Sequence, residues 1–213
     1  MKDLAIYGAG GYGREVACLI HAINEVKKEW NLIGFFDDVK EVGYRNEYGE
    51  VFGGYNVLNA YSSELSVVFA IGNPQGVANL VEKIHNPNIE YPNIIAADIL
   101  FFDQNTIQMG FGNIIGFKSS ISCNVHLGNF NRLNGSISIG HDVFIGNFNM
   151  FNPSTRISGD VRIGDCNFFG VGSIVLQKKQ IGNYTTIGAN SVVMKKTKDN
   201  TTYIGNPAIE LKY

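Results

Sequence analysis

Two adjacent side chains in this sequence, His141 and Asp142, are of the types that carry acid–base chemistry. An imidazole with a pKa near 6.5 accepts a proton well at neutral pH. A neighbouring carboxylate can fix its tautomer and stabilise the imidazolium that forms. Adjacent strand residues face opposite ways, so this pairing requires a bend in the chain or a neighbouring subunit. From position alone, His141 is either a general base or an ordinary outward-pointing residue, whereas His21, His85 and His126 are expected at the surface.

A thiol offers a second chemistry, because Cys123 occupies the position of His141 in the preceding unit of the repeat described below. A Cys-His pair could form a covalent acyl-enzyme. A small outward-facing cysteine is usually inert, so we favour direct attack without an acyl-enzyme. The chain has 3 cysteines, an odd count without metal-ligand spacing. We therefore expect reduced thiols, a cytoplasmic protein and no metal site.

A glycine-rich segment in the first fifteen residues could hold an anion. The segment 8–13 reads Gly-Ala-Gly-Gly-Tyr-Gly and lies between an expected strand, 4–7, and an expected helix, 14–28. This G-x-G-x-x-G arrangement places backbone amides at a helix N-terminus around a polar or anionic ligand. A second strand, 32–36, ends in Asp37-Asp38, near the distance at which an acidic residue meets a ribose hydroxyl.

The elements around this loop form half of a doubly wound sheet. A third expected strand, 66–71, leads into Gly72 and a helix over 75–84. A full dinucleotide domain needs two such halves, and only about 90 residues precede the repeat described next. A mononucleotide, or a sugar joined to one, therefore fits better than NAD. A tight turn without any ligand is the alternative interpretation of the glycine motif.

The second half of the chain repeats every six residues. Fifteen consecutive positions at this spacing are large and apolar: Met109, Ile115, Ile121, Leu127, Leu133, Ile139, Ile145, Phe151, Ile157, Ile163, Phe169, Val175, Ile181, Ile187 and Val193. Glycine often follows, and we expect it to permit sharp corners through unusual backbone angles. Such a period is typical of a parallel β-helix in which three short strands make an 18-residue triangular coil.

Residues 18 apart then stack in columns about 4.8 Å apart. The segments GNFNRLN (128–134) and GNFNMFN (146–152) show this interval directly. One inward column contains only asparagines, Asn113, Asn131, Asn149 and Asn167, which predicts an internal amide ladder. The six-residue phase ends after Val193, so residues 195–213 are expected to form a cap or tail rather than another coil.

The composition excludes several classes of protein. The chain has 213 residues, 45% of them hydrophobic, and a net charge of −2. This composition is that of a globular protein with a substantial core. A near-neutral chain without a basic stripe gives no indication of a nucleic-acid partner. No apolar run approaches the roughly 18 residues needed to span a bilayer, so we expect no membrane segment.

The combined motifs GAGGYGR, IGFFDD, IGHD and IGNPA resemble those of bacterial sugar acetyltransferases with a left-handed β-helix. That family includes N-acetyltransferases of UDP-linked amino sugars and the related sialic acid O-acetyltransferases. The resemblance covers nearly the whole chain. It implies an α/β half-Rossmann domain over residues 1–92, followed by a left-handed parallel β-helix of hexapeptide repeats over residues 93–213.

The resemblance also implies a homotrimer with acetyl-CoA bound along the β-helix at subunit boundaries. The catalytic base would be His141, with Asp142 beside it. The positions that match the sugar-nucleotide side are Gly8, Gly10, Gly11, Tyr12, Gly13, Arg14, Asp37, Asp38 and Gly72. The positions that match the CoA side are Asn134, Met150, Gly159, Val171 and Ala189.

Two positions depart from the family pattern. Tyr12 and Met150 stand where histidines are common. Three functions remain open: N-acetylation of a UDP-linked amino sugar, O-acetylation of sialic acid or another sugar hydroxyl, and a non-catalytic trimeric scaffold that binds a sugar nucleotide. The sequence decides neither which sugar is the acceptor nor whether the transferred acyl group is acetyl. Phe130, Phe148 and Phe168 are expected to project outward and line the trimer contact or the CoA groove.

Overall fold

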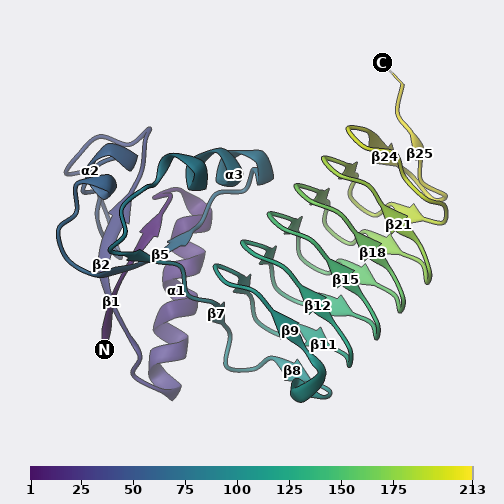
Figure 1. Cartoon of the computed structure of the whole chain (residues 1–213), viewed down its shortest axis with the longest axis horizontal. Helices are drawn as coiled ribbons and strands as arrows, with labels where there is room; N and C mark the ends of the chain where they lie inside the picture. Colours follow the sequence, from purple (N-terminus) through teal and green to yellow (C-terminus); the bar gives the residue numbers. More distant parts are fainter. Residues whose placement is uncertain (213) are drawn as a thin grey trace.

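A four-stranded parallel sheet forms the N-terminal part of the computed structural model, which describes residues 1–212 (Figure 1). Its order is β2 (Trp30–Phe36), β1 (Lys2–Tyr7), β5 (Leu65–Phe69), β6 (Ile89–Glu90). Alternate residues of β1 face opposite layers. Leu4 and Ile6 pack with α1 (Gly11–Val26), whereas Ala5 and Tyr7 pack with α3 (Pro74–Lys83). Helices on both faces make this a half-Rossmann arrangement.

The expected strands and helices of this part are present, with ends shifted by up to three residues. Three short elements between β2 and β6 were not predicted. They are the hairpin of β3 (Arg45–Asn46) and β4 (Gly49–Glu50), and the helix α2 (Tyr55–Asn59). Each is too short to show an apolar period.

A three-sided solenoid forms the rest of the chain, and it is a left-handed β-helix (Figure 1). Each side is a sheet of stacked two- or three-residue strands. The first side contains β7 (Ile94–Ile95), β10 (Ile114–Ile115), β13 (Arg132–Leu133), β16 (Met150–Phe151), β19 (Phe168–Phe169), β22 (Thr186–Ile187) and β24 (Thr202–Ile204), with β25 (Ile209–Glu210) at its edge.

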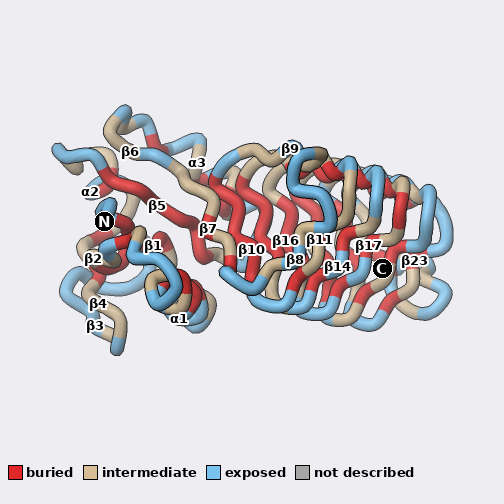
Figure 2. The backbone as a smooth tube through the Cα atoms, turned by 90° about the horizontal axis from the view of Figure 1, so that it is seen from below, coloured by how far each residue is buried: buried red, intermediate tan, exposed pale blue. Residues whose placement is uncertain are grey.

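The two other sides have the same construction. The second contains β8 (Leu100–Phe101), β11 (Ser120–Ile121), β14 (Ser138–Ile139), β17 (Arg156–Ile157), β20 (Ile174–Val175) and β23 (Val192–Val193). The third contains β9 (Gln108–Met109), β12 (His126–Leu127), β15 (Phe144–Ile145), β18 (Arg162–Ile163) and β21 (Gln180–Ile181). The fifteen apolar positions point into this prism, and all but Met109 are buried. Figure 2 shows buried strands separated by exposed turns.

The first coil lies ahead of the region in which the sequence keeps its six-residue phase. In it, Ile94 of β7 pairs with Ile114 of β10, and Leu100 of β8 pairs with Ser120 of β11. Both intervals are two positions longer than those of the later coils, because the 3₁₀ turn η1 (Gln104–Thr106) is inserted. The six-residue phase, which starts at Met109, therefore leaves out this coil because the insertion hides the earlier repeat, although the expected β-helix domain, 93–213, includes it.

The C-terminal end is only partly the predicted cap. β24 adds one more parallel strand, in which Tyr203 pairs with Ile187. β25 then turns back antiparallel on β24. The coil that leads to β24 is two positions shorter than the regular ones, which breaks the periodic pattern. The sequence therefore did not reveal this last strand.

The asparagine ladder is present. Asn113, Asn131, Asn149 and Asn167 are fully buried. Each amide oxygen accepts from the backbone N–H one coil later, at 2.7–2.9 Å. The amide nitrogens of Asn131, Asn149 and Asn167 also donate to the preceding amide oxygen, at 3.0–3.2 Å. The ladder satisfies polar groups that burial would otherwise leave unpaired.

The repeated glycines have a different role from the one expected. Positive φ occurs three positions after the apolar residue, and mostly at residues other than glycine, such as Phe130 (54°) and Asp142 (59°). The glycine directly after the apolar residue instead lies against the next coil. A Cβ added at Gly128 would stand 2.5 Å from the carbonyl oxygen of Gly146. These glycines allow close stacking of coils, and the corners rest on left-handed residues.

Aromatic side chains join the two parts of the chain. Phe130 is 4% exposed, and its ring lies 5.8 Å from that of Phe69 and 5.2 Å from that of Tyr91. Phe148 stacks on Phe130 at 5.3 Å. These side chains do project out of the prism, but the N-terminal part covers them. Phe168 does not share their column, whose next member is Cys166. Phe130 and Phe148 therefore pack within the chain rather than in a CoA groove, and the placement of Phe168 at the trimer contact or the CoA groove stays a prediction.

Candidate active site

His141 and Asp142 form a pair at a corner between β14 and β15. The Nδ1 atom of His141 lies 2.7 Å from Oδ2 of Asp142, and both side chains are about half exposed. The φ angle of 59° at Asp142 turns the chain, so two adjacent residues face the same side. The corner alone produces this pairing, and no neighbouring subunit is needed for it.

The carboxylate of Asp142 is held ionised. Hydrogen bonds from His141 and from Asn124, whose Nδ2 donates to Oδ1 at 3.1 Å, keep the pKa of Asp142 below its ordinary value. The carboxylate of Asp142 favours the tautomer of His141 that carries its proton on Nδ1. In that tautomer Nε2 has no proton and can accept one. The pair therefore has the arrangement of an oriented general base.

Gly159 makes room for the imidazole. It occupies the position one coil after His141 in the prism. A Cβ added at Gly159 would stand 2.5 Å from Nε2 of His141, so only glycine leaves the ring its place. The interval of the repeat is the sequence signal for this relation, and one more coil leads to Gln177 in the same column.

An open groove of about 510 Å³ runs along this corner. It is lined by His141, Ser158, Gly159, Leu176, Gln177, Lys179 and Met194. Family resemblance indicated only the first and third of these as site residues. Groove walls with aliphatic, amide and cationic groups suit an extended ligand that carries both apolar and charged parts.

Cys123 shares the corner column of His141, one coil earlier. Its side chain is partly exposed, and the contact found for its Sγ is with Oγ of Ser122 at 3.9 Å. The backbone oxygen of Cys123 accepts from the N–H of Asp142 at 3.1 Å. These contacts give Cys123 a place in the corner, and no described contact joins its sulfur to the imidazole.

The glycine-rich loop lies at the carboxyl end of β1. Gly8 has φ of 111°, and a Cβ there would stand 2.6 Å from the carbonyl oxygen of Ala70. The Oδ2 atom of Asp37 accepts from the N–H of Ala9 at 2.8 Å. Gly10 caps α1 without a side-chain hydrogen bond, and no acidic residue lies in the first turn of α1. The helix N-terminus is therefore open to a polar ligand.

The two aspartates after β2 are occupied by backbone contacts. Burial raises the pKa of Asp37, but hydrogen bonds from the N–H groups of Ala9, Lys40 and Val39 outweigh burial and leave the pKa below its ordinary value. Asp38 accepts from the N–H of Tyr55 at 3.1 Å. Both carboxylates therefore hold loops in place, whatever ligand contacts they also make.

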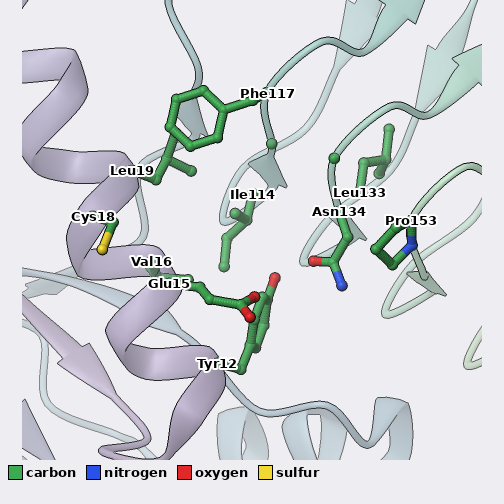
Figure 3. A pocket seen from close by; sticks show the side chains of 12 residues that line it. Tyr12, Glu15, Val16, Cys18, Leu19, Ile114, Phe117, Leu133, Asn134 and Pro153 are labelled. Atoms are coloured by element: carbon green, nitrogen blue, oxygen red, sulfur yellow. The ribbon is translucent and has the colours of Figure 1, made fainter.

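A pocket of about 260 Å³ lies between α1 and the prism (Figure 3). Its walls are mainly apolar, with Ile114, Leu133 and Pro153 on the prism side. The hydroxyl group of Tyr12 is buried without a hydrogen-bond partner and points into the pocket toward Asn134 (Figure 3). Apolar walls with a few converging polar groups are typical of a small-molecule site.

The remaining predicted residues are divided among different places. Asn134, Val171 and Ala189 lie at the corners that follow the first side of the prism, whereas His141 and Gly159 lie at the next corner. Gly72 follows β5, and Arg14 is at the surface, 3.7 Å from Glu47. Within one chain, the structure therefore does not bring His141 together with Tyr12 or Asn134.

Met150 was predicted to lie on the CoA side. Its side chain is 4% exposed, on the side of the prism that the N-terminal part covers. That position faces away from the corner of His141 because strand β16 belongs to a different side. In the single chain, Met150 is therefore a packing residue.

Residues 1–212 contain neither a cluster of metal-ligand side chains nor a helix of membrane-spanning length and apolarity. No group of three or more His, Cys, Asp or Glu side chains is arranged to hold a metal ion in this part of the chain. None of the helices described there is long and apolar enough to cross a membrane.

Comparison with known proteins gives a consistent class. Residues 3–84 match the model of the PglD N-terminal domain. The acetyltransferase domain of PglB from Neisseria gonorrhoeae FA1090 is 26% identical, with a TM-score of 0.89 over 99% of this chain and 100% of that chain. That domain has also been solved in complex with acetyl coenzyme A. No curated protein matches the sequence.

Two other solved structures share the fold. WeeI from Acinetobacter baumannii AYE is 23% identical, with a TM-score of 0.88 over 99% of this chain and 100% of that chain. PerB from Caulobacter crescentus, in complex with CoA and GDP-perosamine, is 21% identical, with a TM-score of 0.83 over 100% of this chain and 98% of that chain. The N-terminal match, the similarity to the PglB acetyltransferase domain and the β-solenoid together fit an acetyltransferase with a left-handed β-helix.

Proposed function

We propose that this chain transfers an acetyl group from acetyl-CoA to the amino group of a nucleotide-linked sugar, with His141 as the general base. The similarity to the PglB acetyltransferase domain, solved with acetyl-CoA, supports the co-substrate. The observation that carries the proposal is the His141–Asp142 pair, which is oriented and faces an open groove. A UDP-linked sugar is the expected substrate, and the base of the nucleotide is left to the experiment below.

The chemistry needs little from the protein beyond position and one base. The amine nitrogen attacks the thioester carbonyl carbon while Nε2 of His141 takes the proton that the amine loses. Collapse of the tetrahedral intermediate breaks the C–S bond and releases CoA, whose sulfur takes up a proton. The products are an N-acetyl sugar and CoA. A well-placed base contributes about 10²–10⁴-fold to such a step.

The groove at His141 fits the extended shape of acetyl-CoA. Leu176 and Met194 offer apolar contact to a pantetheine chain, and Lys179 offers a cation to a phosphate. The glycine-rich loop fits the sugar nucleotide, because the first turn of α1 that follows it has no acidic residue. This division gives each substrate its own part of the chain.

The two parts lie at different corners of one chain, so we propose that the reaction centre forms between chains. In a homotrimer of prisms, the corner with His141 of one chain would meet the corner with Asn134 of the next. Exposed apolar side chains occur at both corners, with Phe117 at 40% and Val171 at 50% near Asn134, and Leu176 at 37% near His141. Such side chains favour burial in an interface.

The test is release of thiol from acetyl-CoA with a panel of acceptors: UDP-, GDP- and dTDP-linked amino sugars, and free sialic acid. We expect release with one of the nucleotide-linked amino sugars and a mass increase at its amine. His141→Ala should lower kcat by about 10² or more, while calorimetry should show unchanged affinity for CoA. Release with sialic acid alone would show O-acetylation instead, and no release with any acceptor would favour a non-catalytic binding protein.

A further inference from the structure

Arg132 is a buried cation at the junction of the two parts of the chain. It precedes the inward-facing Leu133 in β13 and therefore points out of the prism, yet it is only 1% exposed because the N-terminal part covers it. Its Nη1 atom donates to the carbonyl oxygen of Ile71 at 2.8 Å. Its Nη2 atom donates to that of Phe148 at 3.3 Å.

No carboxylate compensates this charge among residues 1–212. None of the ion pairs found there includes Arg132, and its Nε atom has no hydrogen-bond partner. Burial lowers the pKa of Arg132 to about 10, so the guanidinium stays charged at neutral pH. A buried charge that lacks an ionic partner destabilises the folded state, and a buried donor without an acceptor does so to a smaller extent. Packing alone would be served better by an apolar side chain.

The position of Arg132 indicates a reason for keeping the charge. Ile71, which accepts its hydrogen bond, follows β5 and directly precedes Gly72. Tyr12, in the first turn of α1, is close enough for the guanidinium to lower the pKa of its hydroxyl against the stronger effect of burial. The hydrogen bond places the guanidinium against the loop after β5, and its charge reaches Tyr12 in the first turn of α1, which follows the β1 loop.

These two loops form the crevice in which open parallel sheets bind ligands. The strand order β2-β1-β5-β6 places β1 between β2 and β5, so the chain reverses direction across the sheet between β1 and β5. Ligands bind outside the carboxyl ends of the strands at such a point. The open N-terminus of α1 lies there as well. A helix N-terminus and a buried cation at one crevice both favour an anion.

We propose that Arg132 makes the crevice between the β1 and β5 loops selective for the diphosphate group of the nucleotide-linked sugar. The inference rests on the proposed function for its substrate class. Arg132 acts as a positioning residue: its charge favours the anion, and its hydrogen bond fixes the loop that precedes Gly72.

The test compares the affinities of nucleoside diphosphates and nucleosides by calorimetry. The affinity of UDP is compared with that of uridine, GDP with guanosine and dTDP with thymidine. The pair whose diphosphate binds most tightly is then used to measure the variants. We expect the wild-type chain to prefer the diphosphate by at least about tenfold. Arg132→Met, which keeps much of the volume but not the charge, should lose most of this preference while the nucleoside affinity stays within about twofold. Arg132→Lys should keep most of it.

A matched control is Arg162→Met, which removes an exposed arginine from another solenoid strand, β18, and should leave the preference unchanged. A role limited to joining the two parts predicts instead that Arg132→Met lowers the thermal midpoint and weakens both ligands equally, which would overturn the proposal. Arg132→Gln is measured alongside, and failure of both uncharged variants to fold would also overturn it.

The outcomes separate this proposal from the proposed function. If UDP or another diphosphate binds and Arg132→Met keeps the wild-type preference, only the role of Arg132 is wrong. If no diphosphate binds to the wild-type chain, the nucleotide-linked substrate is wrong, and the role of Arg132 with it. The acetyl-transfer assay is independent of both binding measurements.

Discussion

Among individual residues, the candidate base depends most on local backbone geometry. The φ angle of 59° at Asp142 is one of a series of left-handed corner residues, and it alone allows adjacent side chains to meet at 2.7 Å. The two residue types are visible in the sequence but this geometry is not, because positive φ at a residue other than glycine cannot be told from its identity. The pairing thus follows from the repeat rather than from a special feature of the site.

Replacement of Asp142 by asparagine tests the orientation of the imidazole. An asparagine amide can donate to Nδ1 and so favour the tautomer whose Nε2 already carries a proton, which cannot act as a base. We expect kcat to fall by about 10–10³-fold, with the KM for acetyl-CoA unchanged. Equal kcat values for the variant and the wild-type chain would contradict the role of Asp142.

The pH dependence follows from the same carboxylate. Its pKa lies below the ordinary value of an aspartate, because His141 and Asn124 donate to it. The stability that the charge of Asp142 contributes to the folded state is therefore fully present at pH values above the ordinary pKa of an aspartate. It is lost only as the pH falls through the lowered pKa of the folded state. In the pH–rate profile of the wild-type chain, we expect no change from titration of Asp142 above about pH 4.

Replacement of Gly159 by alanine tests the space around the imidazole. The added methyl group would stand 2.5 Å from Nε2 of His141, so the ring must move out of its place. We expect kcat to fall by at least about tenfold, with little change in the thermal midpoint, because the φ angle of Gly159 is not in the left-handed region. Gly76→Ala, on α3, is the control, since the nearest atom to its added Cβ is 3.6 Å away. Unchanged turnover in Gly159→Ala would show that the imidazole does not need this position.

Among the strands and helices, the regular coils are well predicted from sequence and their exceptions poorly. The six-residue period identifies fifteen inward apolar positions from Met109 to Val193, because each coil repeats the same environment. The period does not mark the first coil or β24, because one interval is two positions longer than the regular one and the other is two positions shorter. Such an insertion or deletion leaves the fold intact but destroys the pattern by which it is recognised.

The asparagine ladder leads to a prediction about the stability of the coils. Asn149→Ala removes an amide oxygen that accepts from the backbone and side chain of Asn167, at 2.9 and 3.0 Å. It also leaves the amide oxygen of Asn131 with fewer donors. Buried groups left unpaired cost about 1–3 kcal/mol each, so we expect the thermal midpoint to fall by about 6 °C or more.

The control for this prediction is Asn105→Ala, which changes an exposed asparagine in η1 and should alter stability by less than about 0.5 kcal/mol. Equal midpoints for Asn149→Ala and Asn105→Ala in a melting experiment would mean that the ladder does not stabilise the coils. The ladder was predictable from sequence, because asparagine recurs at one inward column in four successive coils, where only mutual hydrogen bonding favours it.

Across the molecule, the candidate site is divided between two places. Tyr12 lies with Asn134 at one corner, and His141 lies at another. Family resemblance indicated residues of both parts, but it did not show that they are apart in one chain. The burial of Arg132 was not predictable, because its position in the repeat marks it as an outward, exposed residue. Only the packing of the N-terminal part on that side of the prism buries it.

A reaction centre shared between chains is tested by complementation of two inactive variants. His141→Ala removes the base, and Gly10→Asp places a negative charge in the open loop, where an added Cβ meets nothing within 4 Å. Each variant alone should be inactive in the thiol-release assay. After refolding together in equal amounts, the mixture should regain about a quarter of the wild-type activity, because about that share of all interfaces joins an intact His141 to an intact loop. No recovery, with mixed oligomers verified by mass spectrometry, would contradict a centre formed between chains.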